Sequence, residues 1–209
     1  MPWKVSLEAT SFSSDQLPPE SVPEIAVAGR SNVGKSTLIN ALLGVRLAHV
    51  GATPGKTRSI NFYSVQAPVP FRLVDLPGYG YASRSKAERS EWSRLIASYV
   101  ERRRTLCLVC HLVDFRHGLL ENDRNLQEWL VGCGKMILVV FTKADKITRG
   151  RHRAFVQQYV RDGLRSIDVP IVTSGESRVG IEELRGFIDR FLAAPRDEKG
   201  VRGPDESKA

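Results

Sequence analysis

The chain has 209 residues, of which 42% are hydrophobic and 26% charged, a balance typical of a globular protein with enough apolar material for one core. No stretch is long and apolar enough to span a bilayer, and residues 1–20 lack the apolar segment of a signal peptide, so we expect a cytoplasmic protein. The formal net charge is +8, and nearly all of it lies between residues 44 and 104, where there are eleven Lys/Arg and four Asp/Glu. Such a basic region favours a polyanionic partner, although a solvated charged face would have the same composition.

The N-terminal part of the chain is rich in Ser and Pro and weakly periodic. Residues 1–22 are therefore predicted to form an irregular lead-in to a single domain, 23–194. A buried strand, a helix and a long Gly- and Pro-rich loop are predicted in turn at 23–29, 35–43 and 44–58. Two strands joined by a Pro-rich turn and one amphipathic helix follow, at 60–65, 71–76 and 85–103.

The second half of the chain alternates apolar runs with helical patterns. Strands are predicted at 106–114, 135–142 and 168–173, and helices at 121–132, 151–164 and 180–194. Continuous apolar strands separated by helices imply a mostly parallel sheet with helices on both faces. We therefore predict a three-layer α/β fold. The polar tail, 195–209, is predicted to be disordered.

The segment GRSNVGKS matches the P-loop pattern G-x-x-x-x-G-K-[ST], and it follows a predicted strand and opens a predicted helix. Its glycines allow the backbone N–H groups to surround phosphates, and the helix N-terminus favours the same anions. Lys35 would neutralise β- and γ-phosphates, and the hydroxyl of Ser36 would bind Mg²⁺. The predicted phosphate-binding residues are Gly29, Arg30, Ser31, Asn32, Val33, Gly34, Lys35, Ser36 and Thr37.

The segment DLPG lies at the carboxyl end of the predicted strand 71–76. An aspartate that leaves a buried strand needs a partner, and after a P-loop Asp75 is expected to orient a Mg²⁺-bound water. Gly78 would let a backbone N–H approach the γ-phosphate. The segment adds Asp75, Leu76, Pro77 and Gly78 to the predicted site.

The segment TKAD follows the predicted strand 135–142 and has the form [NT]-K-x-D of a guanine-recognition element. The carboxylate of Asp145 can accept hydrogen bonds from the ring N–H and the amino group of guanine, which adenine does not offer. A site of this kind discriminates by about 10⁴-fold or more. The stem of Lys143 would cover the base, and a backbone N–H after the last strand would meet the guanine carbonyl. The predicted base-binding residues are Thr142, Lys143, Ala144, Asp145, Thr173, Ser174 and Gly175.

In their order and spacing these elements resemble the translation-factor-related GTPases. Their amino-acid sequences are similar to those of the EngB (YihA/YsxC) family of bacterial ribosome-biogenesis GTPases. The resemblance covers about residues 20–194 and is carried by PEIAVAGRSNVGKSTLINALLG, PGKTRSINFY, LVDLPGYGYA, VDFRHG and FTKADK. It implies a six-stranded sheet, two mobile switch loops, GTP and GDP as ligands with Mg²⁺, and a role in maturing the large ribosomal subunit. It also implies a link to normal cell division and septation. We expect a monomer that binds neither DNA nor a membrane.

The resemblance also assigns residues to switch I. Thr57 would complete the Mg²⁺ shell when GTP is bound, so the metal ligands would be Ser36, Thr57 and Asp75. The nucleotide-binding loop would comprise Gly55, Lys56, Thr57, Arg58 and Ser59, and the residues acting in hydrolysis would be Lys35, Thr57 and Gly78. With GTP bound, the basic residues expected to touch ribosomal RNA are Lys56, Arg58, Arg84, Lys86 and Arg89.

The chain departs from familiar GTPase patterns at a few positions. Tyr79 stands where small signalling GTPases have a water-orienting glutamine, and only Arg58 and Arg84 could act as a cis arginine, so slow hydrolysis is expected, near or below about 10⁻³ s⁻¹. Asn32 resembles the asparagine with which related GTPases bind K⁺. Ser174–Gly175 replaces the usual Ser-Ala, with little expected consequence. In VDFRHG, the residues Asp114, Arg116 and His117 are expected to brace the next loop rather than to act directly.

Other functions stay open at this stage. A P-loop kinase or ATPase is disfavoured by TKAD, which selects guanine. An RNA-binding module with a vestigial nucleotide pocket is disfavoured by the complete set of Lys35, Ser36, Thr57, Asp75 and Asp145. A GTPase that acts directly on the division machinery remains an alternative to one that acts on ribosomes.

Overall fold

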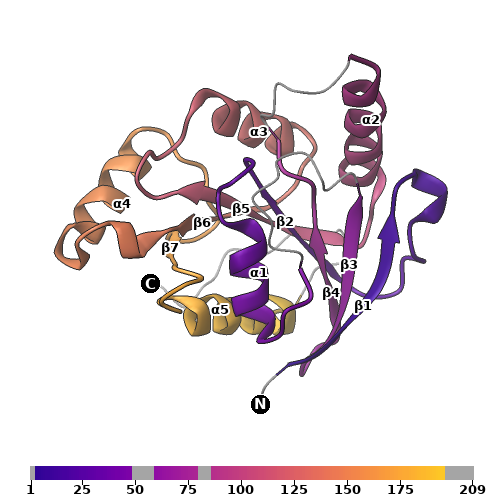
Figure 1. Cartoon of the computed structure of the whole chain (residues 1–209), viewed down its shortest axis with the longest axis horizontal. Coiled ribbons are helices and arrows are strands. Elements are labelled where there is room, and N and C mark those ends of the chain that lie inside the picture. The colour runs from indigo at the N-terminus through magenta and orange to yellow at the C-terminus, as the bar shows by residue number, and fades with distance from the viewer. Residues whose placement is uncertain (1–2, 49–58, 80–85, 196–209) are drawn as a thin grey trace.

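A central sheet of seven strands has the order β1-β3-β4-β2-β5-β6-β7 (Figure 1). The computed structural model describes residues 3–48, 59–79 and 86–195, with the backbone alone for 86–93. The strands are β1 (Lys4–Ser11), β2 (Glu24–Gly29), β3 (Ile60–Gln66), β4 (Phe71–Asp75), β5 (Leu106–Asp114), β6 (Ile137–Thr142) and β7 (Ile171–Val172). The pairs β1–β3 and β3–β4 are antiparallel, and all other neighbours are parallel.

Helices cover both faces of this sheet, as Figure 1 shows. The α-helices are α1 (Lys35–Leu43), α2 (Lys86–Arg102), α3 (Glu121–Gly132), α4 (His152–Arg161) and α5 (Ile181–Ala193), and short 3₁₀ helices occupy Ser14–Gln16, Ala144–Lys146 and Arg149–Arg151. Side chains of α1 and α5 bury one face of the sheet, and side chains of α2, α3 and α4 pack on the other. The predicted three-layer α/β fold is confirmed.

The N-terminal segment differs from the prediction. Instead of an irregular lead-in, Lys4–Ser11 forms β1, which pairs with β3 through a bulge between Leu7 and Ala9 and makes the sheet seven-stranded rather than six-stranded. β1 is an edge strand in which the apolar residues Val5, Leu7 and Ala9 alternate with polar ones, and the prediction missed this short strand signal because it relied on the Ser- and Pro-rich composition of the N-terminal segment. Just before it, Trp3 is buried against Phe71 with ring centroids 5.2 Å apart.

The central strand β2 lies between β4 and β5 and is parallel to both. Every residue of β2 is buried, as expected for a strand covered on two faces. The register pairs Val27 of β2 with Asp75 of β4, so the residues that follow both strands emerge at one edge of the sheet. Ligands of open α/β sheets bind outside such carboxyl ends, and this fold therefore places its site there.

At the opposite end of β2, Glu24 is fully buried and lies among cationic partners. Arg103 donates to both carboxylate oxygens, from Nη2 at 2.6 Å and from Nε at 2.9 Å, and the hydroxyl of Tyr99 donates at 3.1 Å. Arg72 Nη1 lies 3.4 Å from Glu24 Oε1, and the same guanidinium forms a two-point contact with Glu8 of β1. One carboxylate thus connects β2, β4 and the end of α2, and through Arg72 it also reaches β1.

Replacing Glu24 with glutamine should lower the free energy of unfolding by about 3 kcal/mol, because it leaves two buried guanidinium groups without their shared counter-charge. Urea denaturation measures this change. The matched control is Glu182→Gln, which affects an exposed carboxylate paired with Arg185, and it should change stability by less than about 0.5 kcal/mol. Similar losses in both variants would contradict a special role of the buried cluster.

Candidate functional site

The loop between β2 and α1 has the backbone that a P-loop requires. Gly34 has φ of 99° and Asn32 has φ of 64°, and this left-handed region favours glycine and tolerates asparagine. A Cβ on Gly29 would lie 2.9 Å from Cγ1 of Val33, so the loop packs too tightly for a larger residue. Helix α1 begins at Lys35, and the N–H groups of its first turn have no partner within the helix. The loop is thus built to bind an anion.

Lys35 and Asp75 form a buried ion pair at this end of the sheet. Lys35 Nζ donates to Asp75 Oδ1, and the residues are 9% and 3% exposed. The structure brings together the predicted phosphate-binding lysine and the predicted metal-associated carboxylate, from α1 and β4. Ser36, the next residue of α1, adds a hydroxyl to the same region. A carboxylate and a hydroxyl are oxygen ligands of the kind that Mg²⁺ prefers, so the donor set fits this ion.

The segment after β4 folds back onto the P-loop. Leu76 N–H donates to the carbonyl of Val27, Tyr79 N–H donates to the carbonyl of Gly29, and Ser31 N–H donates to the carbonyl of Tyr79 at 3.0 Å. A Cβ on Gly78 would lie 3.1 Å from the backbone nitrogen of Ser31. Gly78 is therefore placed directly beside the P-loop, as its predicted approach to a γ-phosphate requires.

The predicted base-binding residues lie beside the P-loop as well. Thr142 Oγ1 donates to the carbonyl of Val33 at 2.7 Å, and Lys143 Nζ donates to the carbonyl of Asn32 at 2.7 Å. The N–H of Ala144 donates to the carbonyl of Thr173, which joins the loop after β6 to the loop after β7. Both predicted base-recognition segments are thus brought together and fastened to the phosphate loop.

Asp145 is oriented by its neighbours. Ser174 Oγ donates to Oδ1 at 2.7 Å, and Lys146 Nζ lies 3.0 Å from Oδ2. The hydrogen bond from Ser174 and the nearby Lys146 lower the pKa of Asp145 against a smaller opposing effect of burial. The carboxylate therefore stays ionised well below neutral pH and remains an acceptor for N–H donors.

Gly175 packs against the backbone of α1. A Cβ at this position would lie 2.9 Å from Cγ2 of Thr37 and 3.0 Å from the carbonyl carbon of the same residue. Glycine in place of the more usual alanine is therefore a requirement of close packing between the loop after β7 and α1. The sequence alone did not indicate this contact.

Curated relatives are similar in sequence to this chain over most of its length. A family model described as 50S ribosome-binding GTPase matches residues 24–143. The probable GTP-binding protein EngB of Alkaliphilus metalliredigens is 45% identical over 183 residues, which are 86% of this chain and 86% of that protein. The one from Syntrophomonas wolfei is 42% identical over 190 residues, 90% of this chain and 97% of that protein. The chain belongs to the EngB family of GTP-binding proteins.

Solved structures agree with this fold. The structure of a probable GTP-binding protein EngB matches with a TM-score of 0.64 at 24% identity, and the match covers 81% of this chain and 98% of that protein. Era in complex with MgGDPNP and nucleotides 1506–1542 of 16S ribosomal RNA has a TM-score of 0.70 at 22% identity, over 90% of this chain and 61% of Era. The protein is thus an EngB-family P-loop GTPase, an enzyme that binds GTP and hydrolyses it.

Asp114 both braces its own loop and contacts the EngB-family TKAD segment. Its carboxylate accepts hydrogen bonds from the backbone and side chain of Arg116, which confirms the predicted bracing. Its Oδ2 also lies 3.0 Å from Lys143 Nζ. Burial alone would raise the pKa of Asp114, but hydrogen bonds from Arg116 and Lys143 outweigh it and hold the pKa well below its usual range. Asp114 therefore helps to orient Lys143, a role that the sequence did not reveal.

Several predicted residues lie outside the described part of the chain. These are the switch-I residues Gly55, Lys56, Thr57 and Arg58, and also Arg84. Lys86 and Arg89 lie in α2, where only the backbone is described. Ser59, the last residue of the predicted loop, is buried just before β3. The metal role of Thr57 and the predicted RNA contacts stay predictions.

Sequence reasoning missed a polar cluster next to Gly78. His111 of β5 and Asp123 of α3 are both buried and lie within hydrogen-bond distance of the hydroxyl of Tyr79. One signal was available, since His111 interrupts the apolar run 106–113. None of the sequence motifs described above includes His111 or Asp123, and only folding brings them together.

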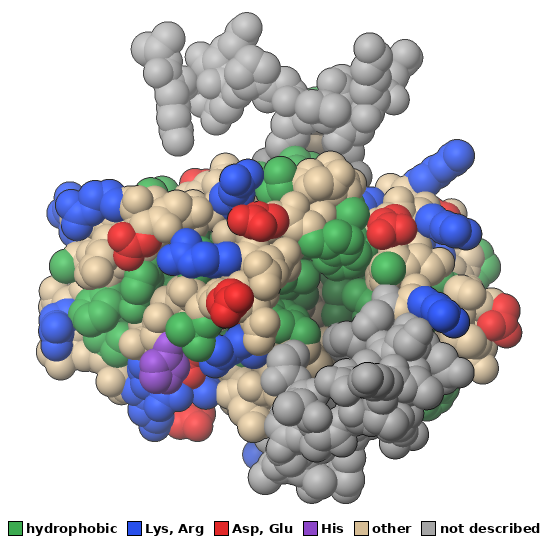
Figure 2. Space-filling view, turned by 90° about the horizontal axis from the view of Figure 1, so that it is seen from above, with side chains coloured by type: hydrophobic (Ala, Val, Ile, Leu, Met, Phe, Trp, Pro, Cys, Tyr) green, Lys and Arg blue, Asp and Glu red, His purple; other side chains and the backbone are tan. Residues whose placement is uncertain are grey.

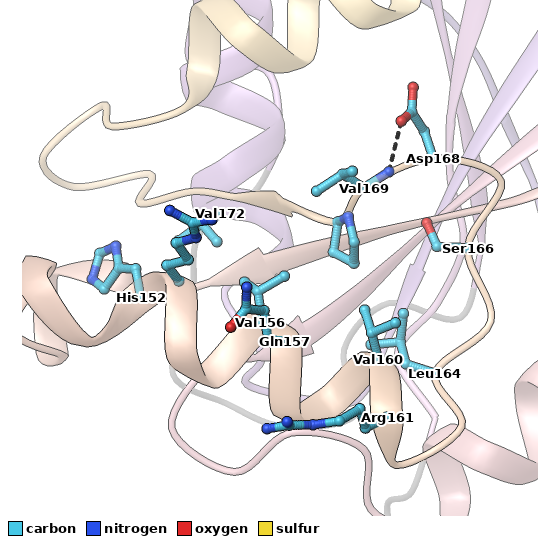
Figure 3. A pocket seen from close by; sticks show the side chains of 12 residues that line it. His152, Val156, Gln157, Val160, Arg161, Leu164, Ser166, Asp168, Val169 and Val172 are labelled. Carbon is cyan, nitrogen blue, oxygen red and sulfur yellow. Dashed lines mark hydrogen bonds between the residues drawn. The ribbon is translucent and has the colours of Figure 1, made fainter. Parts of the chain in front are cut away.

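A groove of about 900 Å³ lies between α4 and residues 164–172 (Figure 3). Val156, Val160, Leu164 and Val169 give it an apolar wall, and none of its lining residues is a predicted site residue. It is thus separate from the nucleotide-binding residues.

Charged side chains are mixed on the surface that Figure 2 shows, where the basic and acidic residues of the described chain alternate. No helix in residues 3–48, 59–79 and 86–195 has the length and apolar character needed to cross a membrane.

Replacing Asp145 with asparagine should weaken GDP binding by about 100-fold or more, because an amide cannot accept both guanine donors. Binding of xanthosine diphosphate should improve, since its 2-carbonyl can accept from the amide. Displacement of a fluorescent nucleotide measures both affinities. Asp168→Asn, at an exposed aspartate that lines only the α4 groove, serves as the control. An unchanged preference for guanine in Asp145→Asn would contradict the assigned role.

Proposed function

We propose that this EngB-family GTPase is a nucleotide-gated assembly factor for the large ribosomal subunit that acts in the cytoplasm. The observation that carries the proposal is the match of residues 24–143 to the family described as 50S ribosome-binding GTPase. Era, which shares the fold, is bound to 16S ribosomal RNA in its own structure. Arg72 and Arg103 are buried with Glu24, but the other nine basic residues between 44 and 104 still exceed the four acidic ones and support an RNA-rich partner for this chain as well.

Different residues at the carboxyl edge of the sheet bind different parts of GTP. Lys35 and the P-loop N–H groups hold the β- and γ-phosphates, and Asp145 recognises the base. Ser36, Thr57 and Asp75 would hold Mg²⁺, with Asp75 acting through water, and the ion would neutralise charge on the phosphates. Gly78 donates its N–H to the γ-phosphate, so GTP and GDP are distinguished at this residue.

Hydrolysis is proposed to be slow in the absence of a partner. The hydroxyl of Tyr79 lies 2.6 Å from Asp123 Oδ1 and 2.7 Å from His111 Nε2, so it is already engaged in hydrogen bonds. Without a residue to orient water, the rate is expected near or below about 10⁻³ s⁻¹. We propose that Asn32 is a ligand of K⁺, because it resembles the K⁺-binding asparagine of related GTPases and is exposed in the P-loop next to the expected phosphates.

Hydrolysis should therefore be about tenfold or more faster in KCl than in NaCl of the same ionic strength, because a cation at Asn32 stabilises charge in the transition state. Asn32→Gly keeps the left-handed backbone but removes the side chain, and it should abolish the difference. Phosphate release under single-turnover conditions measures the rates. A wild-type rate that is equal in the two salts would refute the K⁺ assignment.

Co-sedimentation with purified large ribosomal subunits and their precursors tests the assembly role. The protein should pellet with the particles when a non-hydrolysable GTP analogue is present, and much less with GDP or without nucleotide. Moderate salt should weaken binding, because Lys56, Arg58, Arg84, Lys86 and Arg89 are proposed to contact ribosomal RNA. Neutralising Lys56 and Arg58 should have the same effect.

The matched control neutralises Lys199 and Arg202 in the polar tail, which should leave binding unchanged. Equal binding in all three nucleotide states would contradict nucleotide gating. A GTPase that acts directly on the division machinery would then become the leading alternative.

A further inference from the structure

Two elements, α3 and β5, contact the side chain of Tyr79, the residue after Gly78. Its hydroxyl oxygen lies 2.6 Å from Oδ1 of Asp123 on α3 and 2.7 Å from Nε2 of His111 on β5. Asp123 is 2% exposed and His111 is fully buried. Two close polar contacts in the interior hold a phenol far more firmly than packing alone.

The partners determine where the protons lie. A carboxylate only accepts, so the hydroxyl of Tyr79 donates to Asp123 and accepts from Nε2–H of His111. The other ring nitrogen of His111 then accepts from the side-chain amide of Gln127, which lies 3.2 Å away. Gln127 also accepts from the N–H of Arg165. Every polar atom of this cluster is satisfied by one consistent set of donors and acceptors.

The carboxylate at the centre is itself fixed. Asp123 Oδ2 accepts from the N–H of Leu120 at 3.0 Å and lies 4.0 Å from Nε of Arg30 in the P-loop. Burial would raise the pKa of Asp123, but the polar groups that face it lower it overall, so it is ionised at neutral pH. Burial, followed by the charge of Asp123, raises the pKa of Tyr79, so the phenol keeps its proton and donates it to a charged acceptor.

Backbone hydrogen bonds also hold Tyr79, and with it the preceding Gly78, against the P-loop. Tyr79 and Arg30 form a parallel bridge in which Tyr79 N–H donates to Gly29 and Ser31 N–H donates to Tyr79. The residue that follows Gly78 is thus held at both its side chain and its main chain. Gly78 in turn lies too close to Ser31 for a Cβ to fit without displacement.

We propose that Tyr79 is a positioning residue for the γ-phosphate: its hydroxyl, anchored on Asp123 and His111, holds the N–H of Gly78 in place beside the P-loop and so favours GTP over GDP. This inference rests on the proposed contact of Gly78 with the γ-phosphate. An anchored Gly78 loses little conformational entropy when GTP binds, whereas an unanchored one must first be ordered. GDP has no γ-phosphate, so the anchor does not affect its affinity.

Tyr79→Phe removes the hydroxyl and keeps the ring. It should lower affinity for the β,γ-imido analogue of GTP about tenfold, the effect of losing a hydrogen bond to a charged group, while the affinity for GDP changes less than about twofold. Asp123→Asn should act in the same direction, and the double variant should lose less than the sum of the two single losses, because both variants remove the hydrogen bond between Tyr79 and Asp123. Calorimetric titration with each Mg-nucleotide gives the ratio of affinities.

Tyr159→Phe is the matched control. Tyr159 lies on α4, and its hydroxyl donates to the carbonyl of Phe115 at 3.1 Å, so its removal should leave both affinities unchanged. Gly78→Ala tests the underlying contact separately: its Cβ would crowd Ser31 of the P-loop and so weaken binding of both nucleotides, but it should weaken binding of the GTP analogue about tenfold more than that of GDP. If Gly78→Ala is selective but Tyr79→Phe leaves the ratio unchanged or weakens both nucleotides equally, the positioning role is refuted and the γ-phosphate contact stands. If Gly78→Ala is not selective, the proposed contact fails and the positioning role fails with it.

Discussion

The carboxylate of Glu24 has no exposure to solvent, and it therefore needs positive partners wherever the fold places it. Arg103 supplies a two-point contact from the end of α2, and Arg72 lies opposite Glu24 in the register of β2 and β4. This pairing sets the two parallel strands side by side, and three residues further along the same register places Val27 next to Asp75. The alignment of the P-loop with Asp75, the carboxylate predicted to associate with the metal, at one edge of the sheet depends on that register. Arg72 also binds Glu8, so the edge strand β1 is fastened to the same centre.

The places of the sequence motifs in the fold were predicted correctly from local sequence. The P-loop follows a strand and opens a helix as expected, and TKAD follows the apolar strand β6. The strand β1 was missed although Val5, Leu7 and Ala9 alternate with polar residues, because this pattern is short and lies in a Ser- and Pro-rich segment; its pairing with β3 becomes visible only in the fold. The cluster around Tyr79 was hidden for another reason, since His111 and Asp123 come together only when β5 and α3 meet the segment after β4. Asp114 was assigned to its own loop, but it also contacts Lys143, which lies 29 positions further along the chain, directly after the neighbouring strand β6.

The polar groups near the expected nucleotide have a common arrangement, in which each is held by a partner from another element. Lys35 of α1 meets Asp75 of β4, and Lys143 meets both Asp114 and the carbonyl of Asn32. Ser174 orients Asp145 across two loops. Such mutual support keeps buried or half-buried charges paired, and it aims them at one edge of the sheet. The chemistry of the site is therefore a property of the assembled sheet rather than of any single motif.

The tight contact of Gly175 with Thr37 has a further consequence. The loop predicted to bind the base packs closely on the helix predicted to bind the phosphates, so the distance between the two ends of the expected nucleotide site is fixed. Binding of the guanine end then raises the effective concentration of the phosphate end at the P-loop. A nucleotide of the right span should gain more affinity than its nucleoside and its phosphates would contribute separately, and one of the wrong span should gain little.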